Sequence, residues 1–144
     1  MEQKKLPPVA LGTWSWGIGA VGGDQVFGNH LGEAELKSGF DAAMEHGLNL
    51  WDSAVVYGMG ASEDILGLFA KTCPREQVIL STKFTPQIAG DTADPVAEMY
   101  EGSLKRLGTN YIGIDYTDVS TGLTIRLMWR NGLLTWFRWS RAER

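Results

Sequence analysis

The sequence predicts an α/β fold in which parallel strands alternate with helices. Two apolar runs, residues 48–52 and 77–83, have the length and composition of buried strands. Segments with helical periodicity lie between the strand-like runs, joined by short links. This alternation implies parallel strands with right-handed crossovers. A doubly wound sheet and a (β/α)8 barrel both satisfy the pattern.

The first expected elements are a strand at residues 8–16 and a glycine-rich loop at residues 17–32. The loop matches the pattern G-x-G-x-x-G at residues 17–22. A dinucleotide fingerprint must open directly into a helix, and further glycines follow here, so no helix is expected before about residue 33. We therefore interpret the segment as a mobile loop over the mouth of the fold, with His30 solvated or at the substrate rim.

The next elements are a helix at residues 33–46 and the strand at 48–52. The helix has one apolar face formed by Leu36, Phe40, Ala43 and Met44. Gly47 is a suitable C-cap, and His46 in the last turn suits the negative end of the helix dipole, so it needs no catalytic explanation.

Two further helices and two strands complete the pattern. A helix is expected from a Ser62 N-cap to about Lys71, before the strand at 77–83. Its apolar face comprises Ile65, Leu66, Phe69 and Ala70. Asp94 followed by Pro95 predicts the start of another helix, which Gly108 ends, and residues 111–119 are expected to form the fourth strand.

Three residues of complementary chemistry stand at the ends of the two apolar runs. Asp52 ends the first run, Tyr57 follows five residues later, and Lys83 ends the second run. Carboxyl ends of parallel strands meet at one edge, so these side chains are expected to converge. An isolated tyrosine has a pKa of about 10, and a neighbouring ammonium lowers it by stabilising the phenolate. The trio would then be a general acid that protonates a carbonyl oxygen as hydride reaches its carbon.

The residues alone leave a second interpretation of this trio open. Asp52 and Lys83 could form a structural ion pair, with Tyr57 as a packed loop aromatic. Likewise, Gly12 could merely relieve crowding in a strand and Trp14 could merely pack.

Five short motifs resemble those of the aldo-keto reductases, in that family's order. They are Gly12-Thr13-Trp14, Asp52-x-Ala54-x-x-Tyr57-Gly58, Ser62-Glu63-x-x-Leu66-Gly67, Ser81-Thr82-Lys83-Phe84 and residues 103–109 (SLKRLGT). The resemblance implies a (β/α)8 TIM barrel, an NADPH cofactor, a small carbonyl substrate and a catalytic tetrad of Asp, Tyr, Lys and His. It assigns the first three catalytic roles to Asp52, Tyr57 and Lys83, and it makes Gly12, Thr13, Trp14 and Asp52 cofactor-binding candidates.

Length limits how much of such a barrel the chain can form. A (β/α)8 barrel typically needs about 250 residues, and the chain has 144. Residues 1–119 are therefore expected to form the N-terminal half of a barrel, with about four βα units. Open barrel edges imply self-association, instability or a fragment of a longer protein, of which we favour the last two.

Composition places the chain among cytoplasmic globular proteins. It is 44% hydrophobic and 21% charged, with a net charge of −4. This mild acidity argues against nucleic acid or an anionic membrane as partner, and no apolar run approaches the ~18 residues of a membrane span. Cys73 is the single cysteine, so a reducing compartment fits. No metal site is expected, and Cys73 is interpreted as a packing residue.

Residues 120–144 differ from the rest of the chain. They hold five arginines, one acidic residue and three of the six tryptophans, without helical or strand periodicity. One interpretation is a genuine basic, tryptophan-rich tail, and the other, which we favour, is an aberrant or disordered segment produced by a one-base frameshift near Val119. One amino-acid sequence that the neighbouring reading frame permits resembles the family's sequence after its fourth strand, including the histidine. Sequencing the gene tests this hypothesis.

The tetrad histidine has no counterpart in the fourth predicted strand. The family also places most phosphate and adenosine contacts in the second half of its barrel. We therefore expect this chain to be inactive alone, although its ancestry is that of an NADP-dependent carbonyl reductase. The alternatives are a non-catalytic truncated or frameshifted product, or a nicotinamide-binding regulatory module.

Overall fold

The fold is described from a computed structural model that defines residues 6–114 and the backbone of residues 115–117, 124–128 and 134–138. In these residues six strands form one sheet in sequence order. The strands are β1 (Leu11–Gly12), β2 (Leu50–Asp52), β3 (Ile79–Phe84), β4 (Ile114–Thr117), β5 (Thr124–Met128) and β6 (Leu134–Arg138). Pairing is parallel from β1 to β4 and antiparallel from β4 to β6.

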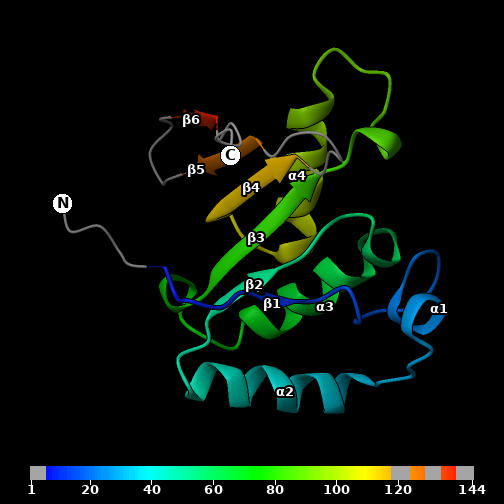
Figure 1. Cartoon of the computed structure of the whole chain (residues 1–144), viewed down its shortest axis with the longest axis vertical. Helices are drawn as coiled ribbons and strands as arrows, with labels where there is room; N and C mark the ends of the chain where they lie inside the picture. Colours follow the sequence, from blue (N-terminus) through cyan, green and yellow to red (C-terminus); the bar gives the residue numbers. More distant parts are fainter. Residues whose placement is uncertain (1–5, 118–123, 129–133, 139–144) are drawn as a thin grey trace, which may run out of the picture.

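Helices connect the parallel strands. They are α1 (Gly23–Phe27), α2 (Glu33–Glu45), α3 (Ala61–Ala70) and α4 (Pro95–Leu107), with short 3-10 turns η1 (Tyr57–Gly60), η2 (Arg75–Gln77) and η3 (Pro86–Ile88). Figure 1 shows α3 and α4 behind the strands and α2 alongside α3. Contacts run from α2 to α3 and from α3 to α4, so the three long helices form one layer.

One hydrophobic core lies between this helical layer and the sheet. Its aromatic centre is the stack of Phe40 from α2 on Trp51 from β2, with ring centroids 4.9 Å apart. Leu66 of α3, Leu80 of β3 and Leu107 of α4 belong to the same cluster. A doubly wound sheet would carry helices on both faces, whereas here a single core serves all three helices, as in a barrel wall.

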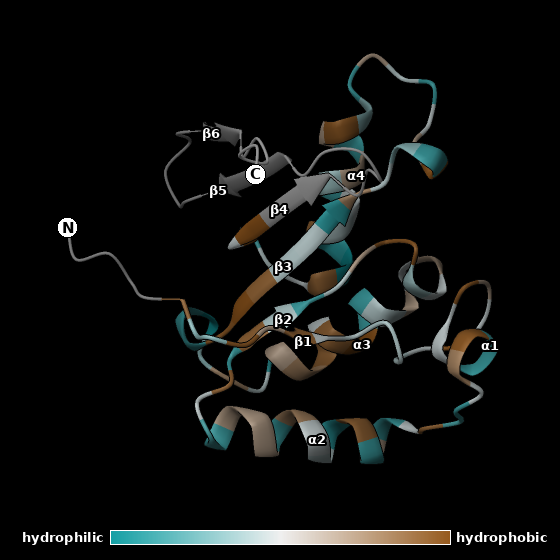
Figure 2. Cartoon of the chain, in the orientation of Figure 1, coloured by the Kyte–Doolittle hydropathy of each residue, from teal (hydrophilic) through white to brown (hydrophobic). Residues whose placement is uncertain are grey.

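The alternation of side chains along β3 separates core from site. Leu80 joins the core, whereas Ser81 and Lys83 point to the opposite face of the strand and contact Asp52. Figure 2 shows β3 passing from an apolar start to a hydrophilic carboxyl end. The strand therefore delivers polar side chains to the end where parallel α/β folds place their sites.

The three long helices are confirmed close to their predicted bounds. The predicted caps at the two outer helices are also confirmed: His46 Nδ1 lies 2.8 Å from the Ala42 carbonyl oxygen, and Gly47 and Gly108 adopt the left-handed backbone. The Asp94 side chain accepts a hydrogen bond from Ala97 N at 3.0 Å, with Pro95 in the first turn. Local periodicity and cap chemistry were sufficient to locate these elements.

Replacing Asp94 by alanine is expected to destabilise the protein by about 1 kcal/mol, because the amide of Ala97 loses its acceptor. The measurement is urea unfolding followed by circular dichroism. Asp91 lies exposed in the preceding loop, so Asp91→Ala is the matched control and is expected to leave the midpoint unchanged. Equal effects of the two substitutions would show that the Asp94 cap adds nothing.

Three predictions about local structure were wrong. The first strand pairs with β2 only at Leu11 and Gly12, instead of extending over residues 8–16. A helix, α1, begins at Gly23, before the expected limit. Ser62 does not cap α3: Gly60 is the N-cap, and the Ser62 hydroxyl donates to Thr13 instead.

The glycine pattern at residues 17–22 now precedes a helix, yet it is not a dinucleotide fingerprint. The amide of Gly19, which a phosphate would need, donates to Asp24 Oδ1 at 3.0 Å. The helix that follows spans only five residues, so it offers a weak dipole. The prediction that this segment is a loop and not a phosphate cradle is therefore consistent with the local hydrogen bonding.

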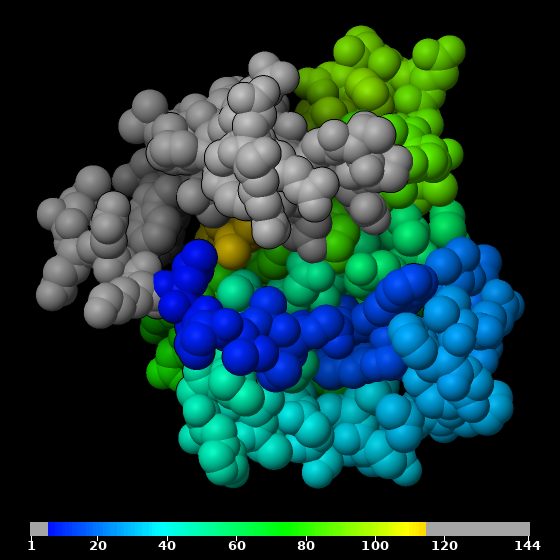
Figure 3. All heavy atoms as spheres, in the orientation of Figure 1, coloured from blue at the N-terminus to red at the C-terminus, as the bar shows by residue number. Residues whose placement is uncertain are grey.

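The last 25 residues contain β5 and β6, where the sequence pattern indicated no strand. Residues 118–123, 129–133 and 139–144 lie outside the described part of the chain. The frameshift hypothesis and the basic-tail interpretation both remain predictions. Self-association also remains a prediction; β1 is one edge of the sheet, and Figure 3 shows the N-terminal segment that contains it on the surface of this face.

Candidate active site

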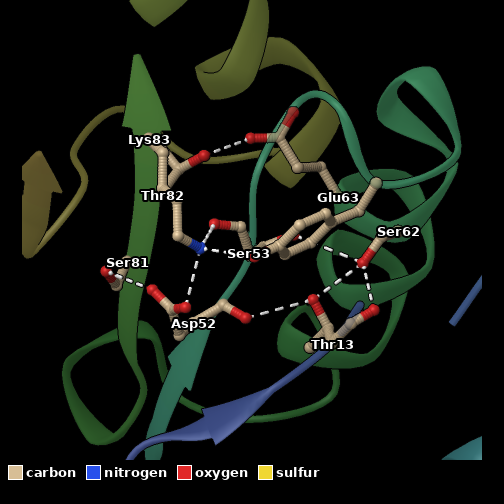
Figure 4. Close-up of polar contacts among 9 residues, drawn as sticks. Thr13, Asp52, Ser53, Ser62, Glu63, Ser81, Thr82 and Lys83 are labelled. Atoms are coloured by element: carbon tan, nitrogen blue, oxygen red, sulfur yellow. Dashed lines mark hydrogen bonds and ion pairs between the residues drawn. The ribbon is translucent and has the colours of Figure 1, made fainter. Parts of the chain in front are cut away.

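Lys83 is the centre of the site. Its side chain is 8% exposed. The ammonium donates to Asp52 Oδ2 at 2.7 Å, to the Ser53 carbonyl oxygen at 2.8 Å and to the Tyr57 hydroxyl at 2.9 Å. Figure 4 shows the Lys83 amine beside Asp52 and Ser53 at the ends of β2 and β3. The structure thus brings together the three residues that the sequence singled out.

The register of β2 and β3 explains why the Asp52 carboxylate lies beside the Lys83 ammonium. Asp52 pairs with Ser81 across β2 and β3, and Lys83 lies two residues beyond Ser81 on the same face. The Ser81 hydroxyl donates to Asp52 Oδ1 at 3.0 Å, so both carboxylate oxygens are engaged. The Asp52 carboxylate is held in one orientation by two neighbours on β3.

An aromatic stack positions Tyr57 at the start of η1. The Trp14 ring lies parallel to the Tyr57 ring at 5.4 Å, and Phe27 of α1 packs edge-on against Trp14, also at 5.4 Å. Trp14 Nε1 and Gly58 N both donate to the Val21 carbonyl oxygen, at 3.2 and 3.3 Å. The loop at residues 17–22 is therefore tied to the tyrosine.

Val21 itself has an uncommon backbone conformation. Its φ of 56° lies in the left-handed region, which costs a β-branched residue about 1–2 kcal/mol. In this conformation its carbonyl oxygen accepts the hydrogen bonds from Trp14 Nε1 and Gly58 N. Strain of this kind concentrates where the surrounding structure fixes a functional geometry, and here it supports the stack over Tyr57.

Donor and acceptor counting assigns a role to each group in the trio. A lysine ammonium only donates, so the Tyr57 oxygen must accept from Lys83. The phenol keeps its own hydrogen for another acceptor. Tyr57 is half-buried, so part of the residue is exposed to solvent. The arrangement can therefore deliver a proton to an oxygen atom at the mouth.

A buried hydroxyl cluster of Thr13, Ser53 and Ser62 joins β1, β2 and α3. All three side chains are fully buried. The Ser62 hydroxyl lies 2.7 Å from both oxygens of Thr13, and Thr13 N donates to the Asp52 carbonyl oxygen at 2.9 Å. The cluster fixes the backbone of Asp52 from behind. No sequence pattern predicted this cluster, since serine and threonine have no characteristic periodicity.

The cofactor-binding candidates differ in accessibility. The Thr13 side chain faces the hydroxyl cluster. By contrast, Gly12 is exposed and has no atom within 4 Å of where a Cβ would stand, and Trp14 is 40% exposed. Their predicted role in cofactor binding remains a prediction.

A buried ion pair lies on the other face of β3. The Glu63 carboxylate is fully buried and accepts from Arg106 Nε and from the Thr82 hydroxyl, both at 2.6 Å. Thr82 precedes Lys83, so this pair anchors the strand segment that carries the lysine. This role was not predicted from the sequence, although Glu63 belongs to the Ser62-Glu63-x-x-Leu66-Gly67 motif.

A large cavity in the described part of the chain is separate from this site. It has a volume of about 790 Å³ and lies at the carboxyl ends of α3 and α4, beside Cys73 and Arg75. The Arg75 guanidinium donates to Thr109 and to the carbonyl oxygens of Val78 and Tyr111. Burial lowers the pKa of this guanidinium, opposed by the nearby Tyr111 and Tyr100. Arg75 therefore has a structural role. Cys73 packs against the hydrophobic core, as predicted.

Other site types receive no support from the described residues. Within them, no group of three or more His, Cys, Asp or Glu residues could hold a metal ion. Likewise, no helix in the described ranges has the length and apolarity needed to cross a membrane. The two histidines of the sequence are His30, which is exposed, and His46 on α2, so neither stands on β4.

Comparison with known proteins identifies the family. The sequence model of the Aldo/keto reductase family matches residues 8–120. A chloroplastic pyridoxal reductase of Arabidopsis thaliana is 32% identical over 130 residues, covering 84% of this chain and 34% of that protein. A probable voltage-gated potassium channel subunit beta from the same plant is 33% identical over 136 residues, covering 86% of this chain and 38% of that protein.

Solved structures support the same conclusion. An aldo/keto reductase from Klebsiella pneumoniae, in complex with NADP and acetate, superposes with a TM-score of 0.58 at 29% identity, covering 76% of this chain and 34% of that one. The chain therefore spans about a third of the length of these relatives. The predicted partial (β/α)8 barrel is confirmed, and the chain belongs to the aldo-keto reductase family.

Proposed function

We propose that Asp52, Tyr57 and Lys83 form the proton-donating part of an NADPH-dependent carbonyl reductase site. The observation that carries this proposal is the Lys83 ammonium bonded at once to the Tyr57 hydroxyl and to the Asp52 carboxylate. The ammonium stabilises the phenolate that forms when Tyr57 gives up its proton. Asp52 keeps the ammonium charged and in place, and Trp14 keeps the phenol ring oriented.

The residues beside the trio suit a flat, uncharged ring such as nicotinamide. Gly12 offers open space next to Asp52, because no atom lies within 4 Å of its missing Cβ. The half-exposed Trp14 indole borders the same edge. We propose that Gly12 and Trp14 hold the cofactor ring, whose chemistry is hydride donation. The Klebsiella pneumoniae relative bound to NADP favours this cofactor.

We further propose that the chain by itself turns over slowly. No histidine stands on β4 to stabilise the developing charge on the carbonyl oxygen, and loss of one such donor lowers kcat by about 10²–10³-fold. Weak cofactor binding would add to this loss, because the chain spans only about a third of the length of its relatives.

The test is single-turnover reduction with the protein in excess over an aldehyde and with saturating NADPH. A panel of aliphatic and aromatic aldehydes is incubated, and the alcohols are quantified by mass spectrometry. Alcohol formation above the protein-free blank supports the proposal. The proposal would be contradicted if the protein unfolded cooperatively but neither bound NADPH nor formed alcohol.

A nicotinamide-binding regulatory module is the second candidate. It is favoured by the 33% identity to the probable potassium channel subunit beta of Arabidopsis thaliana. In that case the aldehyde assay would stay at the blank, while NADPH would bind and raise the unfolding temperature. A truncated product without function would instead show no cooperative unfolding.

A further inference from the structure

The cavity between the carboxyl ends of α3 and α4 lies outside the proposed reductase site. Its volume of about 790 Å³ is within the range of small-molecule pockets, about 300–1,000 Å³. Part of its wall is apolar, formed by Ala70, Leu104 and Leu107. The loops that border it precede β3 and β4, whereas Asp52 and Lys83 stand at the carboxyl ends of their strands. A ligand in the cavity would therefore not displace a substrate.

Cationic side chains outnumber acidic ones around this cavity. Among the described residues that line it, Lys71, Lys105 and Arg75 are basic and Glu101 is acidic. The whole chain has a net charge of −4, so this excess of positive charge is local. The two lysines stand at the carboxyl ends of helices, where cations commonly stabilise the helix dipole. The lysines by themselves thus do not indicate a ligand.

Arg75 is different, because it is half-buried and its printed partners carry no charge. Its guanidinium donates to the Thr109 hydroxyl and to the carbonyl oxygens of Val78 and Tyr111. A guanidinium has five N–H donors, so these three bonds leave one N–H on each terminal nitrogen. None of the ion pairs found among the described residues includes Arg75.

A half-buried charge without an acidic neighbour favours an anion from solution. Burial lowers the pKa of the Arg75 guanidinium, since it disfavours the charged form. Buried charges in proteins are normally paired. The Tyr111 ring, whose centroid lies 3.9 Å from the Arg75 Cζ atom, covers one face of the guanidinium but supplies no full charge. An anionic group in the cavity would supply it.

We propose that this cavity binds a small amphipathic carboxylate, with the carboxylate group at Arg75 and the apolar chain on Leu104 and Leu107. The planar guanidinium suits a carboxylate better than a lysine ammonium does. Lys71 and Lys105 add attraction at the rim, and Glu101 opposes it. The ligand class is a medium-chain alkyl carboxylate, such as a fatty acid of about eight carbons, a size typical of such pockets.

Cys73 provides a direct readout, because it lines the cavity and is the single cysteine of the chain. Its alkylation by N-ethylmaleimide is followed by intact mass spectrometry at low ionic strength with increasing octanoate. Alkylation is expected to slow by about tenfold at ten times the dissociation constant, since only the unoccupied protein reacts. The controls are 1-octanol, which lacks the charge, and acetate, which lacks the chain. Equal protection by 1-octanol, or no protection by octanoate, would overturn the proposal.

Two exposed charges on α4 provide variants with opposite expected effects. Lys105→Gln removes a cation from the rim and is expected to raise the octanoate concentration for half-protection by about threefold. Glu101→Gln removes the carboxylate and is expected to lower that concentration by a similar factor. Both side chains are exposed, so the fold should be retained. Lys37→Gln on α2 is the control and should have no effect. Shifts in the same direction for the two α4 variants, or no shift in either, would overturn the proposal.

NMR of the arginine Nε–H signals tests Arg75 without a substitution. Arg75 Nε donates to Thr109 and Arg106 Nε donates to Glu63, so Arg106 is the matched control. Octanoate is expected to shift the Arg75 signal, with the same half-saturation as the protection of Cys73, and to leave the Arg106 signal unchanged. Protection of Cys73 without a shift at Arg75 would overturn the proposal. These readouts need neither NADPH nor an aldehyde, so they are independent of the reductase function.

Discussion

Replacing Tyr57 by phenylalanine is expected to lower single-turnover aldehyde reduction by at least about 100-fold, the contribution typical of a positioned general acid. The phenol oxygen lies 2.9 Å from the Lys83 amine, and phenylalanine removes that oxygen while retaining the ring that stacks on Trp14. The fold and the aromatic stack should therefore persist, and only proton delivery should be lost. The measurement is alcohol formation under saturating NADPH.

Tyr100→Phe is the matched control for this substitution. Tyr100 lies on α4 and packs against the hydrophobic core, away from the three site residues. It is expected to keep the wild-type rate. Reduction that survives in Tyr57→Phe at the wild-type rate would exclude Tyr57 as the proton donor, whatever the identity of the protein's substrate.

Breaking the Glu63–Arg106 pair is expected to give the largest loss of stability. Arg106→Leu leaves a fully buried carboxylate whose remaining partner is the Thr82 hydroxyl, and removal of one partner of a buried pair costs about 3–5 kcal/mol. Glu63→Leu is expected to cost less, because the Arg106 side chain is 26% exposed and can be hydrated. Urea unfolding measures both free energies.

The double variant Glu63→Leu/Arg106→Leu is expected to be more stable than Arg106→Leu alone, since no charge is left buried. The exposed pair Lys37–Asp41 on α2 provides the control, and Asp41→Asn is expected to change stability by less than about 1 kcal/mol. If Arg106→Leu cost no more than Asp41→Asn, the buried pair would not anchor β3.

The outer elements of the fold were predictable because their causes are local. Apolar spacing in α2, the Asp94-Pro95 start of α4 and the glycine after it act within one or two helical turns. The alternation of elements likewise implied parallel strands. The extent of β1 was not predictable in this way, because a strand is defined by its partner, and β2 offers β1 only two paired positions.

The sequence by itself determined which residue types end the two central strands, and hence that Asp52 and Lys83 share an edge of the sheet. Tertiary structure alone decided how they are supported: the hydroxyl cluster behind Asp52, the stack of Trp14 on Tyr57 and the ion pair beneath Thr82. These contacts join residues far apart in the chain, such as Thr13 with Ser62 and Glu63 with Arg106. The physical reason is that periodicity and capping report each residue's neighbours along the chain, whereas hydrogen bonds across the core depend on how the folded elements pack.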